Sequence, residues 1–311
     1  MKPWMKYTLT AVLLLLAAVG AAYYWLFIES TAPEDAHFVL EIDALRELAN
    51  ASAGDKPTSV EVENVALFKF PATAVVAGDG FEAVDMPVYS YRVVYPDRSF
   101  IIDTALDRAI GGEELAAFDE DAYARLQSAM TSAASIVITH EHMDHIGGLT
   151  AHPAAASVLS KAQLTPAQLK DPERSAPARF ADGVLAGYQP FEYDAVAPLA
   201  PGVVLIKAPG HTPGSQMVYV QTAGGAEFLF IGDVAWHFRN IDMQRERARL
   251  VTWLFLKEDR KAVFGQLAAL KRLHDAHPNV HIVPGHDGRI VDALVRSGAL
   301  KEQFSPEGTS E

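Results

Sequence analysis

The sequence has 311 residues, of which 50% are hydrophobic and 21% charged, which excludes a disordered chain and fits one large or two small domains. It contains no cysteine, which excludes disulfides, thiolate zinc sites, iron–sulfur clusters and cysteine nucleophiles. The net charge of −13 argues against a nucleic acid partner, because phosphate binding needs clustered Lys and Arg.

An uncharged segment of 22 residues, 7–28, lies close to the N-terminus. As a helix it would span about 33 Å, enough for the hydrocarbon core of a bilayer. Lys2 and Lys6 precede it, and no basic residue follows before Arg46. From the positive-inside bias we expect a cytoplasmic stub at 1–6, a transmembrane anchor at 7–28, and the rest of the chain on the extracytoplasmic side.

A cleaved signal peptide is the alternative, with Ala18 and Gly20 as small residues before a cut at Ala21. The apolar segment continues through YYWLFI and is longer than a usual signal-peptide core, which favours an uncleaved anchor over a secreted protein. Residues 1–28 hold two lysines and no acid, so the exported part carries a charge of −15. Bound divalent cations would offset part of this charge.

The segment 29–58 is polar, contains prolines and includes a helical pattern over 38–48, so we expect a linker there. From residue 59, short apolar runs separated by Gly, Pro and Asp predict an antiparallel sheet. The predicted strands are 60–70, 72–78, 88–95 and 99–104. A helix over 119–132 with Asp119 as its cap and a strand over 134–139 are predicted next.

The second half of the chain repeats this order of strands followed by a helix. The predicted strands are 203–207, 215–222, 227–233 and 280–283. The predicted helices are 165–170, 258–276 and 289–300. The repetition indicates two similar halves within one sandwich-like domain over 59–305, followed by a short tail at 306–311.

The most specific motif is THEHMDHIGG at 139–148, directly after a predicted strand. It places three histidines and an aspartate within six positions: His140, His142, Asp144 and His145. Imidazole and carboxylate suit zinc and similar divalent ions, and a strand end followed by a tight turn can aim several side chains at one point. Such a cluster arises by chance in roughly one such chain in a thousand, so it predicts a metal site.

Three later residues stand in comparable places. His211 lies in the loop APGHTPGS, Asp233 ends the apolar run EFLFIGD, and His286 lies in VPGHDG just past a predicted strand. Each is in a Gly-containing loop or at a strand end, where site residues on a sheet scaffold are expected.

The order HEHMDH, PGHT, GD and PGHD resembles the metallo-beta-lactamase superfamily over most of residues 59–300. The resemblance implies a mixed α/β (α+β) fold, a four-layer αβ/βα sandwich with a metal site at one edge between two sheets. In this chain an N-terminal transmembrane helix would precede that fold.

The resemblance also implies two divalent metal ions, with zinc as the expected metal. The first ion would be held by His140, His142 and His211. The second would be held by Asp144, His145 and His286. Asp233 would bridge the two ions. Asp103, at the end of a predicted strand, matches a family aspartate that supports a metal-binding histidine, the alternative being an ordinary turn aspartate.

Two close divalent ions would make a shared water a hydroxide nucleophile near neutral pH, and this bridging hydroxide would attack a substrate carbonyl. Asp144 and Asp233 would then belong to the catalytic machinery. The expected reaction is hydrolysis of a lactone or ester bond in a small molecule.

Several branches of the superfamily fit less well. Zinc beta-lactamases typically lack the bridging aspartate and several use a cysteine, whereas this chain has Asp233 and no cysteine. The diiron flavoproteins carry an acid where His142 stands. The branches that process RNA and DNA act on polyanions, for which an exported domain with a charge of −15 is a poor partner.

The quorum-quenching lactonases share all seven ligand positions and the PGHTPGS loop. They commonly have a tyrosine three residues after the bridging aspartate, a position that Trp236 occupies here. We expect Trp236 to line the pocket or the core, and the neighbouring His237 is a candidate acid or base.

Three alternatives remain: a thioesterase of the glyoxalase II type, a phosphodiesterase, and a non-catalytic metal-binding module on the membrane surface. The sequence leaves the oligomeric state and the choice among divalent metals open.

Overall fold

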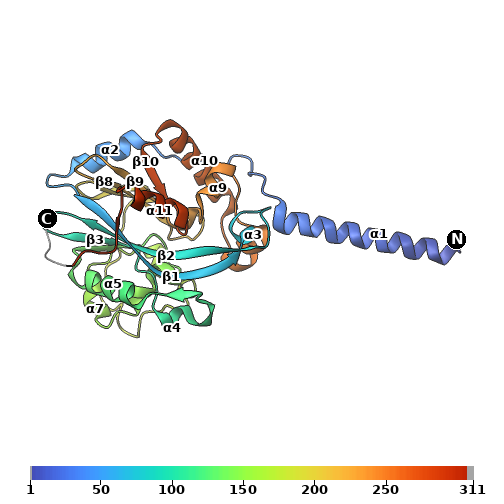
Figure 1. Cartoon of the computed structure of the whole chain (residues 1–311), viewed down its shortest axis with the longest axis horizontal. Helices are drawn as coiled ribbons and strands as arrows, with labels where there is room; N and C mark the ends of the chain where they lie inside the picture. Colours follow the sequence, from blue (N-terminus) through green and yellow to red (C-terminus); the bar gives the residue numbers. More distant parts are fainter. Residues whose placement is uncertain (1, 307–311) are drawn as a thin grey trace.

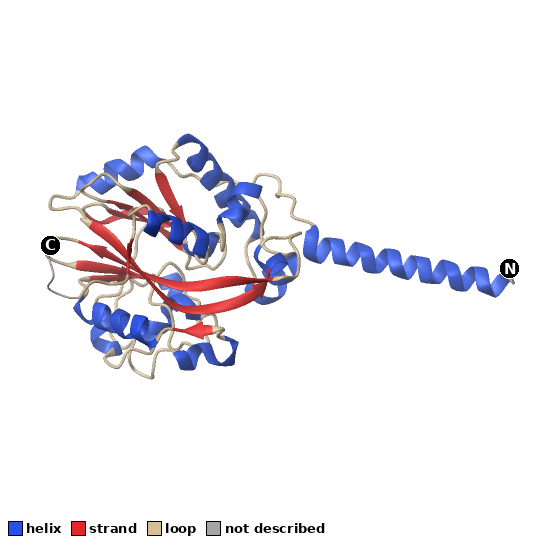
Figure 2. Ribbon diagram, in the orientation of Figure 1, coloured by secondary structure: helices blue, strands red, loops and turns tan. Residues whose placement is uncertain are grey.

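Two β-sheets form the frame of the fold in the computed structural model, which describes residues 2–306 (Figures 1 and 2). The first sheet has the strand order β11-β1-β2-β3-β5, with β4 paired to β1. These strands are β1 (Ser59–Pro71), β2 (Ala83–Val94), β3 (Ser99–Ile102), β4 (Ala117–Phe118), β5 (Ser135–Val137) and β11 (Lys301–Glu302).

The second sheet has the order β10-β9-β8-β7-β6. Its strands are β6 (Val196–Ala200), β7 (Val203–Lys207), β8 (Gln216–Gln221), β9 (Glu227–Phe230) and β10 (Val280–Val283). β9 and β10 run parallel, so their carboxyl ends lie at the same edge of the sheet.

Helices cover the outer face of each sheet. Those on the first sheet are α5 (Glu120–Ser132), α6 (Met143–Thr150) and α7 (Ala155–Leu159). Those on the second sheet are α2 (Ile42–Ala51), α9 (Phe238–Met243) and α10 (Arg260–Ala276). Shorter or connecting elements are α3 (Ala72–Val75), α4 (Arg108–Gly111), η2 (Gly112–Glu114), α8 (Pro166–Leu169), η3 (Gly232–Val234), η4 (Val251–Leu256) and α11 (Gly288–Arg296).

Apolar side chains gather in three clusters that follow this layering. One cluster lies between the sheets and includes Phe100 and Phe230. The other two lie between each sheet and its helices, around Leu126 on one side and Leu267 on the other. Because the central strands are covered on both faces, β7 is a continuous apolar run rather than an alternating one. The mixed α/β fold with two sheets that the sequence predicts is confirmed.

Residues 72–78, predicted as a strand, form the helical turn α3 and a bend instead. Pro71 pairs with Ala83, so residues 72–82 must form the loop that joins β1 to β2. Gly78, with a φ of 86°, helps the chain to reverse there. Pairing of the strands on either side therefore overrides the β-type composition of this segment.

The segment 29–58 contains α2, whose residues Ile42, Leu45 and Ala49 are buried against the second sheet. Upstream of α2, the backbone of His37 lies so close to Gly265 of α10 that a Cβ there would come within 2.7 Å of it. Much of the expected linker therefore packs with the domain. Of the tail expected at 306–311, residues 307–311 lie outside the described part of the chain.

The N-terminal helix α1 (Pro3–Tyr23) continues as the π-helix η1 (Tyr24–Ile28) and projects from the domain as a rod (Figure 1). None of the residues of α1 is buried. The 26 residues have the length and apolar composition of a membrane-crossing helix or of a signal sequence.

Candidate metal centre

The residues of the sequence motifs converge at one edge of the two sheets. His140 and His142 follow β5, and Asp144 and His145 lie in the first turn of α6. The loop between β7 and β8 carries His211. Asp233 follows β9 and His286 follows β10, the two parallel strands that end at the same edge.

The first cluster consists of His140, His142, His211 and Asp233, whose ligand atoms lie within 4.8 Å of one another. Nδ1 of His142 lies 3.1 Å from Nε2 of His140 and 2.9 Å from Nε2 of His211. Nε2 of His140 and Nε2 of His211 lie 3.5 Å and 3.4 Å from Oδ2 of Asp233. Three imidazole nitrogens and one carboxylate oxygen therefore surround one point.

The second cluster consists of Asp144, His145 and His286. Oδ2 of Asp144 lies 3.7 Å from Nε2 of His145 and 3.5 Å from Nε2 of His286. The same two nitrogens lie 3.4 Å and 3.2 Å from Oδ1 of Asp233. The two oxygens of Asp233 thus face different clusters, which is the orientation required of a bridging carboxylate.

These spacings fit divalent metal ions. Ligand atoms placed tetrahedrally at about 2.0–2.1 Å from an ion are about 3.3–3.4 Å apart, close to the separations of Asp233 from its neighbours. Nε2 of His145 and Oδ1 of Asp233 are buried without a hydrogen-bond partner among the described residues. Buried polar atoms of this kind are costly unless a ligand satisfies them, and a cation between them would do so.

Electrostatics keep the first cluster in the form that binds metals. Burial, reinforced by the neighbouring histidine His211, lowers the pKa of His142 to about 3, and burial likewise lowers the pKa of His211 to about 3. Burial also holds the pKa of His140 well below its usual value. These imidazoles are therefore neutral at physiological pH, with free lone pairs for a metal.

Carboxylates dominate the second cluster. Burial acts to lower the pKa of His145, but the carboxylates of Asp103, Asp144 and Asp233 raise it well above its usual value. Burial acts to raise the pKa of Asp233, but the surrounding histidines, His286 foremost, hold it well below. These opposed shifts mark the second cluster as rich in negative charge, which bound cations would balance.

Three histidines are oriented by acceptors on their far nitrogens. Nδ1 of His145 lies 2.8 Å from Oδ2 of Asp103, and Nδ1 of His286 lies 2.9 Å from the Pro87 carbonyl oxygen. Nδ1 of His211 lies 2.5 Å from Oε1 of Glu258. A ring that donates its Nδ1–H in this way presents the Nε2 lone pair to the site.

Asp103 is built into the frame as well as into the site. Its φ is 58°, and its two carboxylate oxygens accept hydrogen bonds from the Thr139 backbone N–H (2.6 Å) and hydroxyl (2.8 Å). The same carboxylate therefore ties the end of β3 to the motif that follows β5 and orients His145.

Glu258 and Arg247 complete the support of His211, and nothing in the sequence marks either of them. Both side chains are buried, and Nη1 of Arg247 lies 2.8 Å from Oε1 of Glu258. Arg247 also donates to the carbonyl oxygen of Asp233. Burial raises the pKa of Glu258 to about 7, and the guanidinium of Arg247 opposes that rise. In the sequence Glu258 is one of several polar residues at the start of the helix predicted over 258–276, which gives no sign of its burial.

Trp236 lies in the core beside the site, as expected. Its Nε1–H donates to Oδ2 of Asp233 at 2.6 Å. The guanidinium carbon of Arg247 lies 4.4 Å from the ring centroid of Trp236, and the ring centroids of Trp236 and His286 are 6.2 Å apart in an edge-on arrangement. The residue that departs from the lactonase pattern is therefore a direct hydrogen-bond donor to Asp233, the residue expected to bridge the two ions.

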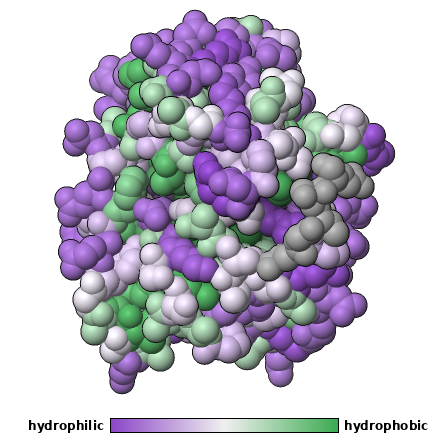
Figure 3. Space-filling model, turned by 90° about the vertical axis from the view of Figure 1, so that its left-hand side faces the viewer, coloured by the Kyte–Doolittle hydropathy of each residue, from purple (hydrophilic) through white to green (hydrophobic). Residues whose placement is uncertain are grey.

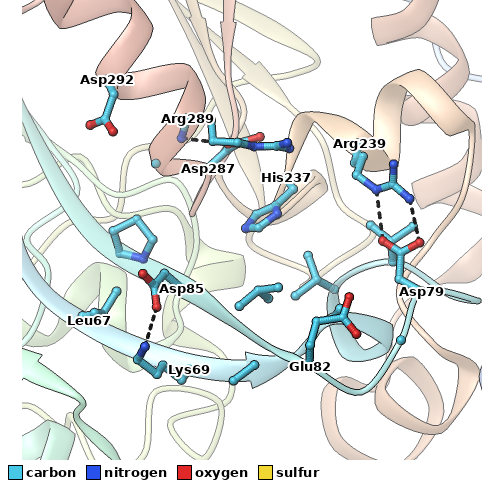
Figure 4. Close-up of a pocket in the computed structure, with 18 of the residues that line it drawn as sticks. Leu67, Lys69, Asp79, Glu82, Asp85, His237, Arg239, Asp287, Arg289 and Asp292 are labelled. Atoms are coloured by element: carbon cyan, nitrogen blue, oxygen red, sulfur yellow. Dashed lines mark hydrogen bonds and ion pairs between the residues drawn. The ribbon is translucent and has the colours of Figure 1, made fainter.

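His237 does not belong to either cluster of ligand atoms. It lines a cleft of about 1100 Å³ between the β1–β2 hairpin and the starts of α9 and α11, toward whose middle its ring points (Figure 4). Burial lowers its pKa, and its Nε2 has no hydrogen-bond partner among the described residues. None of the described residues that line this cleft belongs to the two clusters of ligand atoms; two of them, His237 and Asp287, directly follow Trp236 and His286 in the sequence.

One comparison with known proteins identifies the family. The model of the metallo-beta-lactamase superfamily matches residues 83–286. No protein in the curated set matches the chain. Solved structures with the same fold include an N-acyl homoserine lactone hydrolase with the product N-hexanoyl-L-homoserine at its catalytic metal centre, which has 15% identity and a TM-score of 0.60 over 76% of this chain and 96% of that one.

A point mutant of AiiA from B. thuringiensis, with N-decanoyl-L-homoserine bound at its active site, has the same 15% identity and TM-score of 0.60, over 76% and 96% of the two chains. AidC, a dizinc quorum-quenching lactonase, has 14% identity and a TM-score of 0.52 over 76% and 90%. At these identities the likeness shows the fold, and the family match covers most of the domain. The chain belongs to the metallo-beta-lactamase superfamily.

Proposed function

We propose that the protein is a membrane-anchored, exported hydrolase that uses two divalent metal ions, expected to be zinc, to cleave a lactone or ester bond. The observation that carries this proposal is the orientation of Asp233, whose two carboxylate oxygens face two separate sets of ligand atoms at 3.2–3.5 Å. One set would be His140, His142 and His211. The other would be Asp144, His145 and His286.

When bound, the two ions would generate a nucleophile from water at neutral pH and polarise the substrate carbonyl. Asp233 would hold the two sets of ligands in register. Asp103 and Glu258 would keep the Nε2 atoms of His145 and His211 directed at the ions. Asp144 is half-buried while Asp233 is buried, so Asp144 offers the more accessible carboxylate for a proton passing to the leaving oxygen.

The lactone or ester class is supported by two fold neighbours: an N-acyl homoserine lactone hydrolase with product bound at its catalytic metal centre, and a dizinc quorum-quenching lactonase in complex with product. His237 stays a candidate acid or base, acting on the part of a substrate that enters the cleft of Figure 4. We propose residues 1–6 as cytoplasmic, 7–28 as the anchor and 59–305 as the catalytic domain. The two lysines before the apolar helix and their absence directly after it support this orientation.

The test is hydrolysis by the full chain in detergent, loaded with zinc, together with a count of bound metal per chain. Substrates would be acyl-homoserine lactones, an aryl ester, a thioester, a beta-lactam and a phosphodiester. Asp233→Ala should abolish turnover and lower the metal content, and Asp55→Ala, at an exposed position outside the site, should change neither. Two bound metals with turnover of the thioester or phosphodiester alone would replace the proposal by one of those activities.

A further inference from the structure

Large apolar side chains surround the end of the N-terminal helix on the surface of the domain. Trp253, Leu254 and Phe255 of η4 have exposed fractions of 61%, 52% and 72%. Phe81, in the loop between β1 and β2, is 58% exposed. Soluble domains rarely present so many large apolar residues in two adjacent loops without a partner.

Both loops contact the last turns of the helix. The ring centroids of Trp253 and Trp25 are 5.9 Å apart, in an edge-on arrangement. The ring of Phe81 lies 6.5 Å from that of Tyr23 and 5.7 Å from that of Phe27. The apolar surface of the helix therefore continues onto the domain through two separate segments.

Hydrogen bonds and ion pairs attach the end of the helix and the residues after it to the domain. The carbonyl oxygen of Phe27 accepts hydrogen bonds from the Gly78 N–H (2.8 Å) and from the Thr73 hydroxyl (3.2 Å). The Glu246 N–H donates to the Ser30 hydroxyl at 3.0 Å. Glu29 forms ion pairs with Arg249 and Arg260. A domain attached in this way cannot swing freely about its anchor, so its orientation follows that of the helix.

The depth of these residues follows from the length of the helix. Its 26 residues, rising about 1.5 Å each, span about 39 Å, which exceeds the roughly 30 Å of the hydrocarbon core. The turn with Tyr23, Tyr24 and Trp25 would then lie in the headgroup layer, which Trp and Tyr favour. Trp253 and Phe81, in contact with that turn, would lie at the same level.

We propose that Trp25, Phe81, Trp253, Leu254 and Phe255 form one membrane-contact surface that inserts into the interfacial layer of the lipid bilayer. This inference rests on the proposed anchoring by α1. Beyond anchoring, we infer that the domain contacts the membrane directly in a fixed orientation and is not connected to it through a flexible linker. On the opposite end of the domain, shown in Figure 3, hydrophilic residues predominate among the coloured ones and apolar residues form small separate patches.

Insertion can be measured on the full chain with a fluorophore at a single cysteine, because the sequence contains none of its own. The variants Leu254→Cys and Phe81→Cys, labelled with an environment-sensitive dye, would be reconstituted into phosphatidylcholine–phosphatidylglycerol vesicles. We expect a blue shift and at least a twofold loss of fluorescence when lipids carry a quencher near the headgroup. Asp97→Cys is the control, since it lies in the exposed turn after β2, at the other end of that strand from Phe81.

A fourth variant, Leu14→Cys, reports on the anchor itself through quenchers deep in the bilayer. Quenching at Leu14 without quenching at Leu254 and Phe81 would overturn the contact surface and leave the anchor intact. Absence of quenching at all three positions would overturn both proposals. Quenching at Leu254 and Phe81 to the extent seen at Asp97 would also overturn the contact surface, since it would reflect nonspecific adsorption.

Discussion

At the scale of single residues, the site depends on groups that orient the ligands as much as on the ligands. Oδ2 of Asp233 accepts a hydrogen bond from the Trp236 indole at 2.6 Å while it faces His140 and His211. The tyrosine expected here in related lactonases is replaced by a donor that is itself held under Arg247. Such partners set the direction of a carboxylate and tune its affinity for metal.

Replacing Trp236 by phenylalanine should therefore weaken metal binding or catalysis while still filling the space of the ring in the core. The ring stays, but the Nε1–H donated to Asp233 is lost, and we expect metal affinity or kcat to fall by about 10- to 100-fold. Competition with a zinc chelator and steady-state kinetics measure the two quantities. Trp253→Phe is the matched control, because that indole is exposed and none of the described contacts joins it to the ligand residues. Equal effects of the two changes would contradict the role of Trp236.

The second residue-scale prediction concerns Glu258→Gln. The change replaces the carboxylate that accepts from Nδ1 of His211 and pairs with Arg247, leaving a buried guanidinium without its counter-ion. Breaking a buried pair in this way costs about 3–5 kcal/mol, so the urea midpoint should fall along with zinc affinity. Glu120→Gln, whose pair with Arg108 is exposed on both sides, should change the unfolding free energy by less than about 0.5 kcal/mol. An unchanged midpoint for Glu258→Gln would show that the pair contributes nothing to stability.

At the scale of elements, α6 is the part that must be placed most accurately, because it carries Asp144 and His145. It packs directly on the backbone that follows β3: the Thr104 N–H donates to the His145 carbonyl, and the Gly148 N–H donates to the Ala105 carbonyl, at 2.7 Å and 3.0 Å. This close approach brings Asp103 within reach of the His145 ring. The contact requires small residues on the inner face of the helix.

Gly148→Ala should accordingly displace the metal-site residues on α6, although residue 148 is not itself a candidate ligand. A Cβ at residue 148 would lie 2.0 Å from the carbonyl oxygen of Thr104, so α6 or the loop must move. Overpacking of this kind costs about 1–3 kcal/mol, and the movement should also lower metal content and turnover. Gly224→Ala, whose Cβ would meet only Thr222 at 3.9 Å, is the control. Thermal unfolding and metal analysis of both variants test this prediction. A Gly148→Ala protein that binds as much metal as the unchanged protein would contradict it.

At the scale of the whole molecule, the metal site joins the two halves of the fold. The first half contributes the residues after β5, and the second half contributes His211, Asp233 and His286. Ions held between them would bind the folded chain and not the unfolded one. The stability of the domain should thus depend on metal concentration.

Removal of metal should lower the melting temperature. Zinc at 1,000 times its dissociation constant stabilises by about 4 kcal/mol, which corresponds to a shift of about 8–16 °C for a domain of this size. Differential scanning calorimetry with and without a chelator measures the shift, and added zinc should restore it. Asp233→Ala should reduce the zinc-dependent shift, while Asp55→Ala should keep it. A melting temperature that does not change when the chelator is added would contradict metal binding by the folded state.

Much of the fold could be predicted from the sequence because local apolar patterns and cap residues specify its helices and strands. The strands at 203–207 and 280–283 and the helix after Asp119 lie where their apolar periods and cap residue place them. The helical turn and bend at residues 72–78 could not be predicted from their β-type composition. They form because Pro71 pairs with Ala83, which leaves the residues between them to form the loop. The packing of α2 on the second sheet likewise depends on residues far along the chain.

The sequence by itself determined the family and the residue types of the site, because HEHMDH and the later Gly-flanked His and Asp residues are dense and ordered along the chain. Tertiary structure alone decided how those groups are held. Glu258, Arg247 and the Trp236 indole reach the ligands through contacts that no local pattern encodes. It also decided that the apolar loop at η4 meets the end of the N-terminal helix, because residues 25 and 253 come together only through folding.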